Sequence, residues 1–319
     1  MLVGHEKAWC EWVAAMASGR MHHAWILTGP RGVGKGAFAR AAAAALVKEP
    51  GVHQPEAGAH PDIIVLDHLP SNEDEERKRE EGKPFQIKRN ITIDQIRRMQ
   101  HRLTTRPTLG NRRVIVIDPA DDLEKSAVNA LLKSLEEPPS GTHFLLVTHR
   151  VGRLLPTIRS RCRILRFAPV AEADLNILLQ NAAPGIDTAA RAAVVAAAEG
   201  SPGVALEFLG QGLGPLHMLM QRILREGDGD FSLRGKLAAE VGARPDRQRQ
   251  LAALELARTT IAGEIGKGGR NRQLKIIEAH GTITRLAAQA PTYNFDAGLL
   301  VMEIGGLLAS AALPRESTA

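Results

Sequence analysis

A glycine-rich segment between Gly29 and Gly36 has the spacing of a phosphate-binding loop. It consists of Gly-Pro-Arg-Gly-Val-Gly-Lys-Gly, so that Gly29, Gly32 and Gly34 precede Lys35. Glycines let successive backbone N–H groups turn toward phosphate oxygens, and a lysine at this position reaches the β- and γ-phosphates. A glycine-rich turn with a chance lysine is the alternative, which the apolar run before the loop and the helical pattern after it disfavour. We therefore predict a P-loop that can bind ATP or ADP.

The residue after the lysine departs from the pattern of a working P-loop ATPase. Such enzymes have Ser or Thr there, whose hydroxyl helps to hold Mg²⁺. This chain has Gly36, which offers no side chain to the metal. The nucleotide and water would still bind magnesium, but less firmly. Gly36 therefore predicts weak or absent ATP hydrolysis at this loop.

An apolar run that ends in an acid is the second element of a P-loop site. Residues 114–117 are followed by Asp118, which places a carboxylate beside the expected metal. Active ATPases of this kind follow that Asp with Glu, which polarises the attacking water, whereas here Pro119 follows. Asp121 and Asp122 lie nearby at an offset that does not suit the role, although substitution by one of them stays open. The two losses together predict a site that hydrolyses nucleotide poorly or not at all.

A parallel sheet is the framework that brings these segments together. Five short apolar runs are predicted as strands, at residues 25–28, 63–66, 114–117, 144–147 and 163–167. Helical patterns separate them, after Gly36 through residue 48, at 92–105 and at 126–137. Strands that alternate with helices form βαβ units, which imply a parallel α/β sheet. Thr92 and Gln95 have the spacing of a capping box at the start of the helix at 92–105.

A stretch between residues 69 and 90 has no helical or strand periodicity. It contains a dense run of charges of both signs, Glu-Asp-Glu-Glu-Arg-Lys-Arg-Glu-Glu. We interpret it as a solvated excursion between a strand and the next helix, which is a more ordinary role for such a run than a binding arm.

The composition changes after Pro169, and no further strand is predicted there. Short helical runs at 174–180, 188–199 and 204–209 come first, and longer helices follow from residue 216. The expected domains are an α/β domain at 1–168, a small helical domain at 169–212 and a larger helical domain at 213–319.

The overall composition limits the class of protein. Apolar residues make up 44% and charged residues 24% of the chain, which excludes a mostly disordered protein. The formal charge of +6 is a modest bias toward anionic partners such as nucleic acid. The two cysteines, Cys10 and Cys162, exclude a disulfide framework and a four-cysteine zinc site. Charges interrupt both the N-terminal segment and the apolar stretch 295–313, so we predict no export signal, no membrane span and a cytoplasmic protein.

Two further segments carry a family signature. The first is the string Leu-Leu-Lys-Ser-Leu-Glu-Glu-Pro-Pro at 131–139, and the second is Ser-Arg-Cys at 160–162. With these segments the chain resembles the AAA+ clamp-loader subunits of bacterial DNA polymerase III, over residues 22–166 and more weakly at 200–202. The resemblance implies an AAA+ P-loop α/β domain, a helical lid domain and an all-helical collar domain. It also implies a subunit of a ring-like assembly that loads a sliding clamp on primed DNA during replication.

In this family an arginine from the Ser-Arg-Cys segment completes the ATP site of the next subunit, and that arginine corresponds to Arg161. A guanidinium against the γ-phosphate offsets the charge that develops during phosphoryl transfer. A surface cation in an arginine-rich stretch is the plain alternative. Thr148 corresponds to the family's sensor position, whereas Gly203 stands where motor subunits carry an arginine that contacts nucleotide. Together with the losses in the loop, Gly203 favours the delta-prime class, which donates an arginine without needing its own hydrolysis.

The resemblance implies gamma/tau and delta subunits, the sliding clamp and primed DNA as partners, and no membrane. Arg98 and Arg102 share one helix face and are candidate contacts to DNA phosphates, with a solvated face as an equally good interpretation. Many clamp-loader subunits carry a four-cysteine zinc module, but the corresponding stretch here has only His53, His60 and His68. We therefore expect no structural zinc and interpret these histidines as ordinary loop residues.

The leading prediction is a stator subunit that donates Arg161 in trans and hydrolyses little or no ATP itself. The first alternative is an active gamma/tau-like clamp-loader ATPase, which Gly36, Pro119 and Gly203 disfavour. The second is a P-loop small-molecule kinase, which needs a phosphoacceptor pocket and an arginine-rich lid within the α/β domain. The all-helical second half argues against a kinase.

Overall fold

The computed structural model describes residues 3–55, 58–83, 85–243, 245, 247–290 and 295–312. The chain divides into two compact units, at 1–170 and 171–319. The three-domain division of the chain stays a prediction. No helix within the described ranges is both long and apolar enough to span a membrane.

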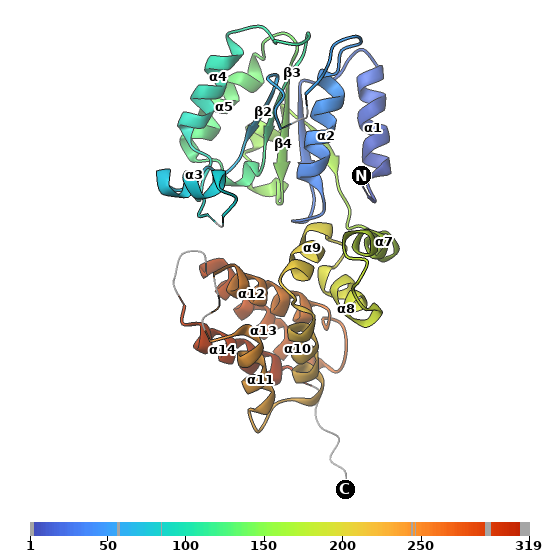
Figure 1. Ribbon diagram of the computed structural model, residues 1–319, viewed down its shortest axis with the longest axis vertical. Helices are drawn as coiled ribbons and strands as arrows, with labels where there is room; N and C mark the ends of the chain where they lie inside the picture. Colours follow the sequence, from blue (N-terminus) through green and yellow to red (C-terminus); the bar gives the residue numbers. More distant parts are fainter. Residues whose placement is uncertain are drawn as a thin grey trace. The chain divides into compact units, whose positions relative to one another are not determined.

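A five-stranded parallel sheet forms the centre of the described part of the first unit (Figure 1). The strands are β1 Ala24–Thr28, β2 Ile63–Leu66, β3 Arg113–Ile117, β4 Thr142–Thr148 and β5 Arg163–Arg166. Their order in the sheet is β2-β3-β4-β1-β5. Every residue of β1 and β3 is buried, as expected of central strands that are covered on both faces. The five predicted strands and their parallel arrangement are confirmed.

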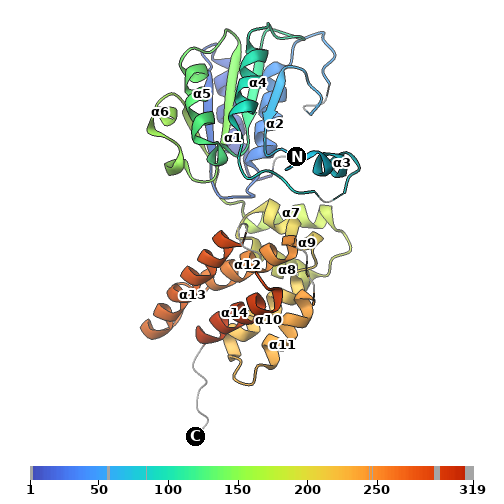
Figure 2. The ribbon, with the colours of Figure 1, turned by 90° about the vertical axis from the view of Figure 1, so that its left-hand side faces the viewer.

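Helices cover both faces of the sheet (Figures 1 and 2). Helices α1 Glu6–Ala17 and α2 Lys35–Val47 pack on one face, and α4 Ile93–Leu103, α5 Lys125–Glu136 and α6 Pro156–Arg159 pack on the other. Trp12, Trp25 and Phe38 fill the core of the first face with edge-to-face ring contacts. The capping box predicted for α4 is confirmed, because the side chains of Thr92 and Gln95 each accept a backbone hydrogen bond from the other residue.

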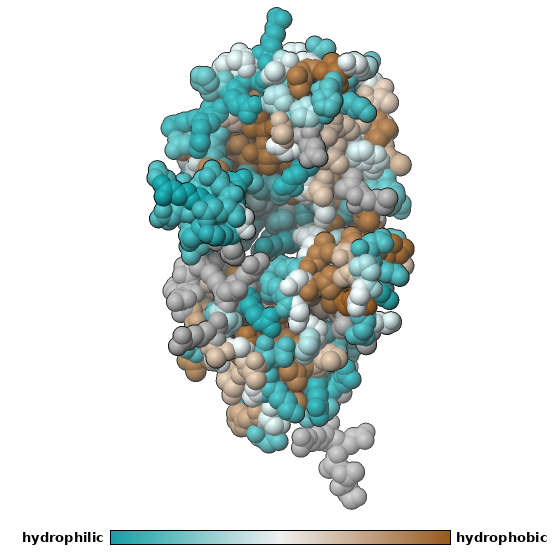
Figure 3. Space-filling model, viewed as in Figure 1, coloured by the Kyte–Doolittle hydropathy of each residue, from teal (hydrophilic) through white to brown (hydrophobic). Residues whose placement is uncertain are grey.

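The charged stretch after β2 contains a helix that its sequence pattern does not predict. Helix α3 spans Glu73–Glu80 and begins at Asn72, whose side chain accepts a hydrogen bond from the Glu75 N–H at 3.0 Å. The buried Glu75 carboxylate accepts bonds from Lys78 Nζ and from the Gln86 N–H, each at 2.6 Å. Capping and one buried carboxylate therefore hold a helix without apolar periodicity, and the other residues of α3 are exposed, as expected of a solvated excursion. Its other charged side chains form a hydrophilic patch (Figure 3).

The second unit is helical over its described residues, as predicted (Figure 2). Short helices come first, α7 Glu172–Ala182, α8 Thr188–Ala198 and α9 Pro202–Gly210. They are followed by α10 Gly214–Glu226, α11 Ser232–Val241, α12 Arg247–Ala262, α13 Arg270–Gln289 and α14 Ala297–Ser310. Their buried faces form one continuous hydrophobic core between Leu175 and Ala311.

Candidate functional site

The glycine-rich segment connects β1 to α2 at the carboxyl edge of the sheet, as a P-loop requires. The carbonyl oxygen of Phe167 approaches Gly29 so closely that an added Cβ would lie 2.4 Å from it. Gly32 and Gly34 have φ angles of +73° and +109°, which residues with a Cβ rarely adopt. Backbone geometry therefore accounts for all three glycines, and the loop ends at the positive end of the α2 dipole.

Lys35 is the first residue of α2 and is buried, with 2% of its surface exposed. Its Nζ donates hydrogen bonds to the carbonyl oxygens of Gly29 at 2.7 Å and Pro30 at 2.5 Å. Burial lowers the pKa of Lys35 to about 8, while the nearby carboxylates of Asp118 and Asp121 act in the opposite direction. The loop thus encloses the ammonium group of Lys35, which lies near Asp118 and Asp121, the acids that follow β3.

The space next to Gly36 is filled by the carboxylate of Asp118. A Cβ added to Gly36 would lie 2.3 Å from Asp118 Oδ2, so Ser or Thr fits here only if the acid moves. Burial raises the pKa of Asp118, and the Arg40 guanidinium, 3.9 Å away, partly offsets this effect. The position of the missing metal-binding hydroxyl is therefore occupied by the protein's own acid.

Thr148, at the end of β4, contacts the acidic turn η1, Ala120–Asp122, which follows β3. Its Oγ1 donates a hydrogen bond to Asp121 Oδ1 at 2.8 Å. The backbone N–H groups of His149 and Arg150 donate to the same carboxylate at 2.7 and 3.3 Å. Thr148 therefore lies at the P-loop edge of the sheet, but its hydroxyl is bound to the protein's own acid.

The two acids of this turn both have partners within the described part of the chain. Asp121 accepts the three hydrogen bonds from the end of β4. Asp122 pairs with the His68 ring at 3.2 Å, a contact that lowers the pKa of its carboxyl against the opposing effect of burial. These contacts disfavour the alternative in which one of the two acids replaces the missing Glu.

His5 is a contact to the loop that the sequence pattern does not reveal. Its Nε2 donates a hydrogen bond to the Val33 carbonyl at 2.6 Å, and its ring packs edge-on against Phe167 at 4.9 Å. A Cβ on Gly34 would lie 3.3 Å from the same nitrogen. The segment before α1 therefore packs directly against the P-loop, and a histidine 28 residues before Val33 carries no local signal for this contact.

Arg161 follows α6 and lies at the surface, with 35% of its side chain exposed. Its Nη2 forms an ion pair with Glu136 Oε1 at 2.7 Å, and its Nη1 donates to the Thr157 carbonyl at 2.9 Å. Glu136 belongs to the Leu-Glu-Glu-Pro-Pro string, so the two signature segments meet at this ion pair. Arg161 is therefore a surface cation with a defined partner rather than a residue enclosed in its own fold.

Arg161 and the P-loop lie at opposite edges of the sheet. Strand β5 begins at Arg163, which pairs with Trp25 near the start of β1, whereas the loop begins after Thr28. Parallel strands rise about 3.3 Å per residue, so the two edges are about 10 Å apart along β1. Helix α5, which connects β3 to β4, ends at the same amino edge and brings Glu136 there. The guanidinium thus lies away from the loop of its own chain.

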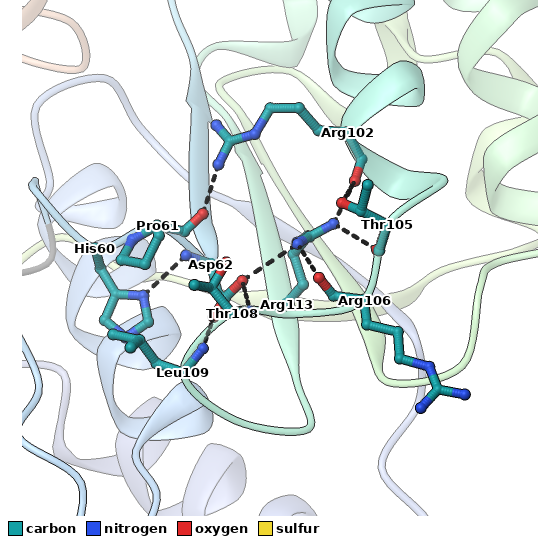
Figure 4. A network of polar contacts seen from close by, with 9 residues as sticks. All are labelled: His60, Pro61, Asp62, Arg102, Thr105, Arg106, Thr108, Leu109 and Arg113. Atoms are coloured by element: carbon teal, nitrogen blue, oxygen red, sulfur yellow. Dashed lines mark hydrogen bonds and ion pairs between the residues drawn. The ribbon is translucent and has the colours of Figure 1, made fainter.

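A buried ion pair anchors the amino edge. Arg113, the first residue of β3, and Asp62, just before β2, lie 3.3 Å apart with 4% and 1% of their side chains exposed (Figure 4). The pair also hydrogen-bonds the backbone in the last turn of α4 and after it, at Arg102, Thr105, Arg106, Thr108 and Leu109. Charged groups, rather than apolar packing, therefore hold this loop to the sheet.

The two candidate DNA contacts, Arg98 and Arg102, are both exposed on α4. Arg98 Nε donates to the Asp94 carbonyl at 3.4 Å, and Arg102 Nη2 donates to the Pro61 carbonyl at 2.5 Å (Figure 4). The exposed Arg106 side chain, in contrast, points away from the network in the same view. Arg102 is therefore bound to the protein's own backbone, and contact with DNA stays a prediction.

The histidines considered for a zinc site have separate surroundings. His60 Nε2 donates to Gln54 Oε1 at 2.6 Å, and its Nδ1 accepts from the Asp62 N–H at 3.0 Å. His68 pairs with an acid of the turn after β3, and His53 is exposed. Across the described ranges, no group of three or more His, Cys, Asp or Glu residues is arranged to hold a metal. The expectation of no structural zinc stays a prediction.

Comparisons with known proteins match residues 4–171 to the family described as DNA polymerase III, delta subunit. This range covers more than half of the chain and nearly all of its first unit. The DNA polymerase III subunit delta' of Pseudomonas aeruginosa is 34% identical over 203 residues, which cover 60% of this chain and 57% of that protein. The subunit of the same name from Escherichia coli K12 is 33% identical over 205 residues, which cover 61% of this chain and 56% of that protein.

The chain spans less than two thirds of the length of these two relatives. Subunits described as gamma and tau also match, over about half of this chain. Among solved structures, a DNA polymerase III gamma subunit-related protein of Thermotoga maritima has a TM-score of 0.54 at 20% identity, covering 93% of this chain and 98% of that chain. This likeness shows a shared fold and agrees with the predicted AAA+ architecture.

Proposed function

We propose, since this chain belongs to the DNA polymerase III delta-subunit family, that it is a delta-prime-type stator that donates Arg161 to the ATP site of a neighbouring clamp-loader subunit. In this role it helps to load the sliding clamp on primed DNA. The observation that carries the proposal is the position of Arg161, a partly exposed surface cation at the sheet edge opposite its own P-loop. A guanidinium there is suited to a triphosphate bound by another subunit, where it stabilises the charge that develops during phosphoryl transfer.

The residues at the carboxyl edge of the sheet support the part of the proposal in which this chain hydrolyses little or no ATP itself. Gly36 offers no hydroxyl to a metal, and the Asp118 carboxylate fills the adjacent space. Pro119 has no side-chain group that accepts a proton, and Asp121 is occupied by the end of β4. Hydrolysis needs a group that orients and deprotonates water, and the positions that supply it in working enzymes are lost or engaged here.

The loop still fits the phosphates of a nucleotide. The backbone N–H groups of the loop, the start of α2 and Lys35 would hold the β- and γ-phosphates of ATP, or the β-phosphate of ADP. Binding requires the Lys35 ammonium to exchange its two carbonyl partners for phosphate oxygens. In this proposal a bound nucleotide is a structural ligand and not a substrate.

The partners that follow from this role are gamma/tau and delta subunits, the sliding clamp and primed DNA, in the cytoplasm. Arg98 is exposed for a phosphate contact in the assembled complex. Arg102 has first to leave the Pro61 carbonyl, which makes Arg98 the stronger candidate of the two.

Reconstitution of the clamp loader with this chain, followed by measurement of DNA-stimulated ATP hydrolysis, tests the role of Arg161. Arg161→Ala should lower turnover at the site that it completes by roughly 10³-fold. Arg166→Ala removes the same charge from an exposed position on β5 and should leave turnover unchanged. Wild-type turnover in the Arg161→Ala complex would contradict the proposal.

An active gamma/tau-like ATPase is the second candidate function, because gamma and tau subunits also match this chain and the P-loop lysine is in place. ATP hydrolysis by the isolated chain with Mg²⁺ separates the two functions. The stator role predicts only background hydrolysis, whereas brisk turnover without partner subunits would favour the ATPase.

A further inference from the structure

We propose that Glu136 is a positioning residue for Arg161, which holds the guanidinium at the surface in the orientation that the neighbouring ATP site requires. This inference rests on the proposed donation of Arg161 in trans. The carboxylate does not touch the nucleotide in this scheme and acts only through the arginine. It gives a physical role to the contact between the Leu-Glu-Glu-Pro-Pro string and the Ser-Arg-Cys segment.

The backbone of Arg161 is fixed on both sides. Ile158, on α6, is fully buried, and the Cys162 side chain packs against the same apolar core. The Arg161 N–H also donates to the Ile158 carbonyl at 3.1 Å. Because these neighbours are anchored, the direction of the guanidinium depends on the side-chain torsions of Arg161 alone.

Few contacts restrain those torsions. Nη1 donates to the Thr157 carbonyl at 2.9 Å and lies 3.5 Å from Ser160 Oγ, and both partners belong to the segment that carries Arg161. Within the described residues, Glu136 is the partner that comes from a different element, at 2.7 Å from Nη2. These contacts use at most three of the five guanidinium N–H groups, so donors remain for phosphate oxygens.

The backbone of Glu136 is itself restrained, so its carboxylate can hold the Arg161 guanidinium in one position. It is the last residue of α5, directly after Leu135, which is buried. The Leu135 carbonyl accepts a hydrogen bond from His23 Nε2 at 3.0 Å, which ties the end of α5 to the start of β1. Pro138 and Pro139 then prevent the helix from continuing. A carboxylate on so restrained a backbone limits the positions that a long, flexible arginine side chain samples.

Glu137 provides a matched control. It carries the same charge one residue later and is exposed. It forms no ion pair with any residue that the structure describes. Replacing Glu137 by Gln therefore changes the net charge of this surface equally, without removing the contact to Arg161.

The test is a double-mutant cycle in the reconstituted clamp loader, with DNA-stimulated kcat and the KM for ATP as readouts. Exposed ion pairs couple two side chains weakly, so Glu136→Gln should lower kcat about two- to five-fold and leave KM unchanged. Glu137→Gln should match the wild type. In an Arg161→Ala background, Glu136→Gln should have no further effect, because its influence passes through the arginine. The kcat difference should also shrink at high salt, which screens exposed charges.

Two outcomes would overturn this inference and leave the proposed function intact. In the first, the Glu136→Gln complex keeps or exceeds the wild-type kcat. In the second, the loss of kcat persists in the Arg161→Ala background, so that Glu136 acts on folding or assembly instead. If Arg161→Ala itself retains full activity, the donation of Arg161 fails, and the role of Glu136 fails with it.

Discussion

The two edges of the parallel sheet differ in what they offer to a nucleotide. At the carboxyl edge, Lys35 is buried against the carbonyl groups of its own loop, and Asp118 fills the space beside Gly36. At the amino edge, Arg161 is partly exposed and held by the surface carboxylate of Glu136. One sheet therefore combines a phosphate loop that offers no hydroxyl after its lysine and a surface cation at the opposite edge. In the proposed stator, only the cation at the amino edge takes part in ATP hydrolysis.

The largest change in stability is expected at the amino edge. Asp62→Ala leaves the buried Arg113 guanidinium without its carboxylate, and removing one partner of a buried ion pair costs about 3–5 kcal/mol. Urea unfolding followed by tryptophan fluorescence measures this loss, because all three tryptophans lie in the first unit. Glu11→Ala, which removes an exposed partner of Arg163, should cost less than about 1 kcal/mol. Equal, small losses in both variants would show that the edge does not depend on the buried pair.

The carboxyl edge should have its own signature in the pH dependence of stability. Burial lowers the pKa of Lys35 to about 8, from 10.5 in the unfolded chain. Between these values the unfolded chain binds the proton that the folded chain has released. The contribution of Lys35 to the free energy of unfolding therefore rises by roughly 2–4 kcal/mol as pH increases through this window.

Comparison of the wild type with Lys35→Met isolates this contribution. Burial raises the pKa of the Cys162 thiol to about 12, which gives the opposite slope in both proteins and cancels in the difference. The measured quantity is the difference in unfolding free energy between the wild type and Lys35→Met, determined at pH 7.5 and at pH 10.5. If this difference is the same at both pH values, the result would contradict the enclosed position of the Lys35 ammonium.

The smallest effect is expected where the missing hydroxyl is restored. Gly36→Ser places a Cβ against Asp118 Oδ2, and rotating that carboxylate away should cost about 1 kcal/mol. Gly152→Ser, whose Cβ would meet no atom within 4 Å, is the control for stability. ATP hydrolysis by isolated Gly36→Ser should stay at background, because Pro119 still supplies no base. Hydrolysis that appears in this variant would show that the hydroxyl alone was missing.

The framework of both edges could be predicted from the sequence. Short apolar runs between turn residues placed all five strands within two residues of their observed bounds. The glycines and Lys35 were recognisable because a phosphate loop is a local motif with fixed spacing. Local patterns therefore sufficed for the parallel sheet and for the position of the loop.

The contacts that make the edges differ could not be predicted, because they join residues that are distant in the chain. The pairing of Glu136 with Arg161 and the contact of His5 with the loop depend on how helices pack on the sheet. Helix α3 was missed for a related reason, since a cap at Asn72 and the bond from Gln86 to Glu75 replace apolar periodicity. Helix α1 was not predicted either.

The central claim is that Arg161, and not the P-loop of this chain, takes part in ATP hydrolysis. It is tested most directly by substituting one residue at each edge of the sheet, in separate variants of the reconstituted clamp loader. The measurement is DNA-stimulated ATP hydrolysis at saturating ATP for the wild type, Lys35→Met and Arg161→Ala. The account predicts that Lys35→Met stays within about two-fold of the wild type, because this chain turns over no nucleotide, while Arg161→Ala loses turnover at the neighbouring site. A rate that is lost with Lys35→Met and retained with Arg161→Ala would contradict it.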